Sequence, residues 1–131
     1  MIELILLAIA SQEAPPPPPA YAEDIVVIGE QMKAVKFRAG FEDGASFCEV
    51  TQSSGDPDID AIVCKSVDYC SDYTKSLFER LADTPRRHRE KARAQMNEAM
   101  GQCMVGAHER FVEDLAERRW LARQNRSGEA E

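Results

Sequence analysis

The stretch that decides the fold is Cys48-Glu-Val-Thr-Gln-Ser-Ser-Gly-Asp-Pro-Asp-Ile-Asp-Ala-Ile-Val-Cys64. Its first residues alternate as in a strand, and its centre has the composition of a turn. Asp56-Pro57 then favours a helix start, because aspartate is a preferred N-cap and proline suits the first helical position. A cysteine stands at each end. We therefore predict a strand that turns into a helix, with a disulfide joining the two.

The residues before this stretch predict a β-hairpin. Residues 32–41 alternate between apolar and charged side chains, Asp43-Gly44 is a hairpin turn signal, and residues 46–51 form the return strand. Strict alternation would place Phe47 and Val50 on opposite faces, so a bulge or burial on both faces is expected. An earlier β-branched run, residues 23–29, predicts one more strand. The sheet should thus be antiparallel with two or three strands.

The residues after it predict two long helices. Apolar side chains recur at steps of three and four from Ile59 to Leu81, which indicates an amphipathic helix. Thr84-Pro85 repeats the start signal and begins a second helix, and the short connection predicts a helical hairpin. Its inward stripe should consist of Met96, Met100, Cys103, Ala107, Phe111 and Leu115. The predicted fold class is α+β: a short antiparallel hairpin sheet packed on a helix and followed by a long helical hairpin.

The four cysteines, Cys48, Cys64, Cys70 and Cys103, favour disulfides over a metal site. The chain has no C-x-x-C, and its two histidines are too far apart in sequence for a zinc motif, so no metal or cofactor is expected. Cys64 and Cys70 lie on different faces of one helix. Of three possible connectivities, Cys48–Cys64 with Cys70–Cys103 is preferred. The second pair is offset by about 7 Å along the predicted helices, so it requires a shifted connection or a helix break.

The N-terminus predicts export to the periplasm or secretion. Residues 1–10 are apolar and end in the small-x-small pattern that signal peptidase accepts; an N-terminal core or anchoring segment is the alternative. The run is too short for a stable membrane span. Residues 11–22 contain five consecutive prolines and predict an extended spacer, with a ligand for a proline-binding module as the alternative. Residues 23–124 form the single α+β domain, and 125–131 are expected to be a disordered tail.

Charge and motifs exclude several function classes. The net charge of −7 disfavours binding to nucleic acid. The basic run 86–93 is interpreted as a solvated helix face, the alternatives being a phosphate site or a contact with the acidic residues 56–60. His108 is expected at the boundary of the core. No nucleophile elbow, phosphate-binding loop or zinc-protease motif is present, so no catalytic residue is predicted.

Residues 34–65 resemble part of the C-terminal domain of the energy-transducing protein TonB, in versions that carry a cysteine pair. The resemblance rests on the hairpin 35–44, Cys48-Glu-Val50, Ser53-Ser-Gly55, Ile59-Asp60 and Cys64. It covers about a quarter of the chain and implies a hairpin that leads into a helix. The family then continues into a final strand, whereas this chain continues into Val67-Asp-Tyr-Cys70 and a charged helix. The transducing activity is therefore not carried over.

A second resemblance lies in residues 24–29, which look like the TonB box of outer-membrane receptors. Such a segment pairs as an added strand with its partner. The resemblance implies a strand-addition contact with a protein partner through Asp24, Ile25, Val26, Val27 and Ile28. The alternative is an ordinary strand of this protein's own sheet.

Together these features predict a non-enzymatic periplasmic or envelope protein that binds an unknown protein partner through strand addition or a helix face. The alternative is a small-ligand carrier or an enzyme that uses a pocket between sheet and helices, with Ser53, Ser54 or the basic helix face. A pocket lined by His108 or arginines would favour this alternative, and a filled interface would disfavour it.

Overall fold

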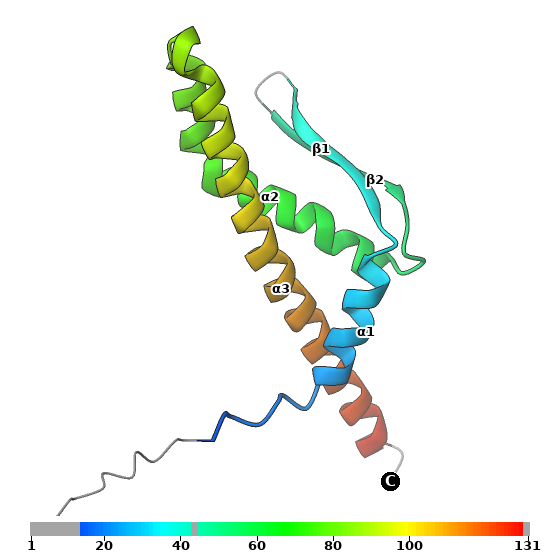
Figure 1. Ribbon diagram of the computed structural model, residues 1–131. Coiled ribbons are helices and arrows are strands. Elements are labelled where there is room, and N and C mark those ends of the chain that lie inside the picture. The colour runs from blue at the N-terminus through cyan, green and yellow to red at the C-terminus, as the bar shows by residue number, and fades with distance from the viewer. Residues whose placement is uncertain (1–13, 43–44, 130–131) are drawn as a thin grey trace, which may run out of the picture.

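The computed structural model describes residues 14–42 and 45–129. The predicted leader 1–10 and the turn Asp43-Gly44 lie outside these residues. The elements in chain order are α1 (Ala22–Met32), β1 (Lys36–Glu42), β2 (Ala45–Gln52), α2 (Pro57–Asp83), the 3-10 helix η1 (Arg86–His88) and α3 (Arg89–Glu129) (Figure 1). This arrangement confirms the predicted α+β class, with a sheet of two strands.

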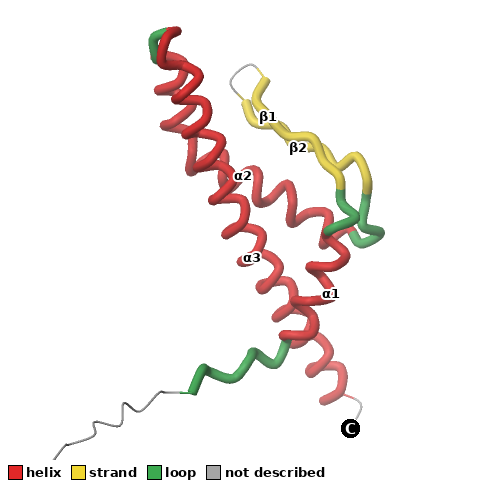
Figure 2. The backbone as a smooth tube through the Cα atoms, in the orientation of Figure 1, coloured by secondary structure: helices red, strands yellow, loops and turns green. Residues whose placement is uncertain are grey.

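Helix α3 is the long element against which the other helices pack. Helix α2 runs back along its N-terminal half, and α1 lies against its C-terminal half (Figure 2). The hairpin rises beside α2, so its turn end lies far from the junction of the three helices (Figure 1). Residues 14–19 are extended and exposed, as predicted for a spacer, and lead away from the folded body.

The hairpin pairs β1 with β2 in antiparallel register, with Gly40 opposite Phe47 and Glu42 opposite Ala45. The register shifts between Lys36 and Phe37. A bulge was expected in the return strand near Phe47 and Val50, and the irregularity lies instead at the base of the first strand. A Cβ at Gly40 would lie 3.0 Å from the ring of Phe47. Glycine at this position therefore lets the Phe47 ring lie against the neighbouring strand.

The predicted strand 23–29 is wrong, because these residues belong to helix α1. Ile25, Ile28 and Met32 recur at helical spacing and pack toward the core, with Ile28 only 1% exposed, while Val26 and Val27 remain 64% and 53% exposed. The β-branched residues favour a strand only weakly, and burial of a helical stripe outweighs that preference.

The tail prediction is wrong for residues 125–129, which continue α3 to Glu129. Their side chains are exposed, and the Ser127 hydroxyl donates to the Arg123 carbonyl at 3.0 Å. Extending an existing helix costs far less than starting one, since each added residue gains a backbone hydrogen bond. Polar composition alone therefore does not end the helix.

Both preferred disulfides are confirmed. Cys48 and Cys64 bond with a Cα–Cα distance of 5.6 Å, and Cys70 and Cys103 with 5.8 Å. The expected offset of the second pair disappears because the helices are joined by residues 84–88, including η1, and α3 itself starts at Arg89 rather than Thr84. Cys70 and Cys103 thus lie at nearly equal distances from the two ends of the connection.

The core is concentrated where the three helices meet. Ile28 of α1 contacts Ile59 and Ile62 of α2 and a cluster on α3 formed by Val112, Leu115 and Ala116. A second apolar seam runs up the helical hairpin through Val67, Cys70, Met96 and Ala107. The buried hydroxyls of Ser66 and Thr74 donate to carbonyls one turn earlier in α2, so they lie in this seam without unmet hydrogen bonds.

We expect removal of the Cys70–Cys103 bond by the double serine variant to lower the free energy of unfolding by about 2–4 kcal/mol. The bond closes a sequence separation of 33 residues, against 16 for Cys48–Cys64, so its loss should cost slightly more than the loss of the other bond. Urea unfolding of the two double variants measures the difference. An unchanged midpoint in either variant would contradict a stabilising role for that disulfide.

Candidate binding sites

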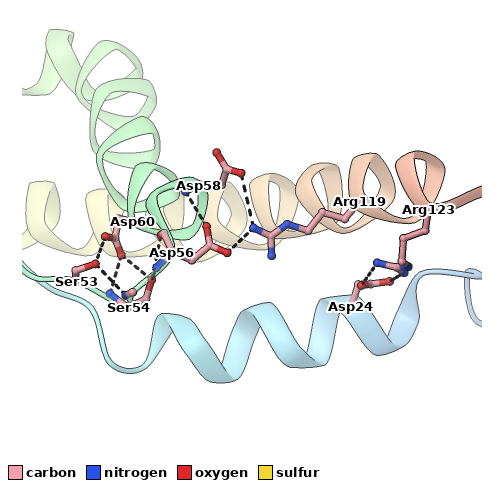
Figure 3. Close-up of polar contacts among 9 residues, drawn as sticks. Asp24, Ser53, Ser54, Asp56, Asp58, Asp60, Arg119 and Arg123 are labelled. Carbon is pink, nitrogen blue, oxygen red and sulfur yellow. Dashed lines mark hydrogen bonds and ion pairs between the residues drawn. The ribbon is translucent and has the colours of Figure 1, made fainter. Parts of the chain in front are cut away.

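The turn between β2 and α2 is built around the Asp60 carboxylate (Figure 3). It accepts from the Ser54 amide at 2.8 Å, from the Ser54 hydroxyl at 2.7 Å and from the Ser53 hydroxyl. These hydrogen bonds, led by the one from Ser53, lower the pKa of Asp60. Gly55 has a φ of +92°, which closes the turn in a conformation that favours glycine. The two serines considered for catalysis are therefore engaged in holding the turn.

Ion pairs to Arg119 tie the same turn to α3, and a further ion pair joins α1 to α3 (Figure 3). Arg119 of α3 contacts Asp56, the N-cap of α2, at 2.6 Å, and Arg123 makes two bonds to Asp24 of α1, at 3.0 and 2.6 Å. Hydrogen bonding to these guanidinium groups lowers the pKa of both carboxyl groups. Asp56 and Asp58 thus pair with Arg119, and Asp60 binds the serines of the turn. None of these contacts involves the basic run 86–93, whose residues are exposed except for Ala92.

The residues predicted for strand addition, 24–28, are divided by the fold. Asp24 is paired with Arg123, and Ile28 lies in the core. Strand pairing through this segment would require α1 to unwind and Ile28 to leave the core. The contact stays a prediction, and the helical conformation disfavours it.

The hairpin itself offers an edge that the sequence analysis missed. The described sheet contains β1 and β2 only, and β1 pairs with β2 on one side. Alternate backbone groups of β1 therefore point to its outer side. Phe37 is 41% exposed, and the Arg38 and Glu49 side chains, 3.8 Å apart across the strands, are both 66% exposed. The sequence did contain one signal for this edge, because a sheet of only two or three predicted strands must have an unpaired edge strand.

A cleft of about 530 Å³ lies between α1, the base of β1, and α3. Its walls are largely apolar, and its principal lining residues include Ile25, Met32, Val35, Phe37, His108 and Val112. Lys33, Glu109 and Glu113 also line it.

His108 is the polar residue of this cleft whose side chain, among the described residues, has an unmet hydrogen-bonding atom. It is partly buried, as expected for a boundary residue, and its Nε2 atom is buried with no hydrogen-bond partner in the described part of the chain. Burial lowers the pKa of His108, which favours the neutral ring. A sheet–helix pocket containing His108 is the feature that favours the small-ligand alternative.

No group of three or more His, Cys, Asp or Glu side chains is placed to hold a metal ion within residues 14–42 and 45–129. Over the same residues, none of the helices combines the length and apolar character needed to cross a membrane. The chain matches no protein-family model, no curated protein and no solved structure. The resemblance to the TonB domain therefore stays a prediction.

We expect Asp56→Ala to lower the free energy of unfolding by about 1–2 kcal/mol, because the variant loses the N-cap of α2 and leaves Arg119 without its nearest partner. Asp58→Ala is the matched control, since the Asp58 side chain is 69% exposed and lies 3.7 Å from Arg119. Its effect should stay within about 0.5 kcal/mol.

The same variant changes the response to acid. The folded pKa of Asp56 is lowered, so its contribution is present at neutral pH and is lost as the pH falls below the unfolded value of about 3.9. Denaturant unfolding at pH 7 and at pH 3 should therefore differ less for Asp56→Ala than for the original chain. Equal differences in the two proteins would contradict this assignment.

Proposed function

We propose that this protein is a non-enzymatic binding module of an oxidising envelope compartment and that it binds a protein partner by strand addition at the outer edge of β1. The observation that carries the proposal is a two-stranded hairpin whose β1 strand has β2 as its sole paired strand among the described residues. Two disulfides support the compartment, because such bonds persist where thiols are not kept reduced.

The mounting of the hairpin supports its use as a template. The Cys48–Cys64 bond fixes the middle of β2 to α2, and the Gln52 side chain donates to the Ala34 carbonyl at 2.8 Å at the base. A strand held in place by its own fold loses little further conformational entropy when a partner adds to it. Most of the ordering cost then falls on the incoming segment.

The exposed side chains of β1 indicate what that segment would carry. Phe37 and Arg38 are successive residues on opposite faces of the strand, and both are exposed. An added strand with an apolar β-branched residue near Phe37 and an acidic residue near Arg38 would complement them. The partner segment is thus expected to be extended, with apolar residues on one face and acidic residues on the other.

Of the two neighbouring residues Arg38 and Ala39, one has a backbone amide that points to the outer edge of β1. We expect a proline substitution at that residue to reduce capture of the partner. Successive amides of a strand point to opposite edges, so one proline removes an outward donor while the other breaks the ladder with β2. The outward variant should keep the thermal unfolding midpoint nearly unchanged and reduce recovery of a specific partner from an envelope extract by about tenfold or more. Unchanged recovery by both folded variants would rule out the β1 edge.

The cleft beside His108 favours a second candidate function, the carriage of a small apolar ligand. Its largely apolar lining suits a short hydrocarbon chain, and His108 and Lys33 stand at the wall for one polar group. Lys33 pairs with Glu30 at 2.8 Å on an exposed face, and such a pair is weak enough to exchange for a ligand carboxylate. A medium-chain fatty acid is therefore a suitable probe.

We expect Gly29→Leu to abolish binding of decanoate. Gly29 lines the cleft, and a Cβ added there meets no other packed atom within 4 Å, so leucine fills space without displacing the fold. Val26→Leu, on the exposed side of the same helix, is the matched control. Calorimetric titration at neutral pH measures binding, and absence of heat with the original chain would exclude this candidate for such ligands.

A further inference from the structure

The helical hairpin carries a groove on a surface separate from the β1 edge. It has a volume of about 390 Å³ and lies between α2 and α3, next to the Cys70–Cys103 bond. Tyr69 and Tyr73 of α2 form one wall, and Gly106, Arg110 and Phe111 of α3 form the other. We refer to these five residues as the tyrosine groove.

The aromatic side chains of this groove are unusually open to solvent. Tyr69 is 47% exposed and Tyr73 is 70% exposed, although they are spaced one helical turn apart on a helix whose other face is buried. The Tyr69 ring meets Phe111 edge to face, with centroids 6.4 Å apart, so this contact orients the Tyr69 ring. On the opposite wall, Gly106 leaves the groove open, because it has no side chain.

This combination suits a polyproline II segment. Proline rings pack between ordered aromatic rings, and the segment's carbonyls are left without internal hydrogen bonds. Arg110 and Gln102, which also line the groove, are side-chain donors for those carbonyls, as are the tyrosine hydroxyls. The segment is already extended before binding, so little entropy is lost when it docks.

The chain itself contains such a segment. Residues 14–19 include five consecutive prolines, are extended, and have exposed side chains throughout. The Ala22 amide bonds to the Pro19 carbonyl at 3.0 Å, and the Tyr21 hydroxyl bonds to Glu113 at 3.2 Å. These contacts fix the start of α1 while the prolines lead away from the body, which presents them to another molecule (Figure 1).

We propose that the tyrosine groove binds the proline-rich residues 14–19 of a second copy of this chain. Each copy offers one segment and one groove, so a reciprocal exchange closes into a two-fold dimer in which both grooves are filled. At about 3.1 Å per residue, the six residues span roughly 19 Å. The proposal goes beyond strand addition and uses residues that the β1 edge does not involve.

The test compares two glycine variants of α3 by sedimentation velocity over a concentration series. Gly106→Leu fills the groove, and Gly101→Leu is the control, since a Cβ at either glycine meets no other packed atom within 4 Å. Both changes raise helix propensity equally. The original chain and Gly101→Leu should form a dimer whose fraction rises with concentration, and Gly106→Leu should weaken it by about tenfold or more.

A mixing experiment separates groove filling from a general loss of association. The double variant Pro16→Ser/Pro18→Ser keeps a working groove, and Gly106→Leu keeps a working segment. Each should be largely monomeric alone, and their mixture should recover a dimer through one intact contact. Equal dimerisation of Gly106→Leu and Gly101→Leu would overturn the proposal, as would a chain that stays monomeric up to roughly 1 mM.

A synthetic peptide of residues 14–20 provides the second measurement. Added to the proline variant, it should shift the ring resonances of Tyr69 and Tyr73 and leave those of Trp120 in place. Absence of shifts would overturn the proposal. A monomeric original chain whose tyrosine resonances already match the peptide-bound state would show that each segment folds back onto its own groove, which would also overturn the exchange between copies.

Discussion

The rest of the structure depends on how the start of α2 is held. Ile59 and Ile62 form the first buried turn of this helix and meet Ile28 from α1 and Leu115 from α3. Directly outside that apolar contact, Asp56 caps the helix and binds Arg119. The start of α2 thus contacts two other helices, α1 and α3, and follows directly from the end of the sheet. Its position sets the direction of the hairpin on one side and of the helical hairpin on the other.

The apolar core described here is small, and disulfide bonds hold in place the parts of the fold that extend beyond it. The part of α3 beyond the junction packs mainly against α2, and β2 is the strand with substantial contacts to α2. Each of these extensions has a disulfide, Cys70–Cys103 in the first and Cys48–Cys64 in the second. Small domains commonly use cross-links in this way, since a limited core supplies limited free energy.

This construction leaves defined surfaces uncovered. An ordinary globular domain would place a further strand beside β1 or a further helix over Tyr69 and Tyr73. Among the described residues, the disulfides hold the hairpin and the two helices without such cover, so an edge and an aromatic groove stay exposed. The two proposed interactions therefore have one structural origin, although they use different faces and different ligands.

Local chemistry in the sequence determined the strand–turn–helix segment, the hairpin, the two long helices and the preferred cysteine pairing. Asp56-Pro57 and the residues at helical spacing act within a few positions of one another, so their signals survive without tertiary context. The junction between α2 and α3 was harder to place, because the 3-10 turn after Pro85 depends on how the helices align.

Only the tertiary structure decided the state of residues 23–29 and the arrangement of the His108 cleft and the tyrosine groove. Ile25 and Ile28 favour a strand or a helix almost equally by composition, and the burial of Ile28 against α2 and α3 decides for the helix. The β1 edge belongs to a local hairpin, whereas the His108 cleft and the tyrosine groove each arise between elements distant in sequence. The side chains in the sequence supply the chemical groups of the cleft and the groove, but only tertiary packing brings those groups close together.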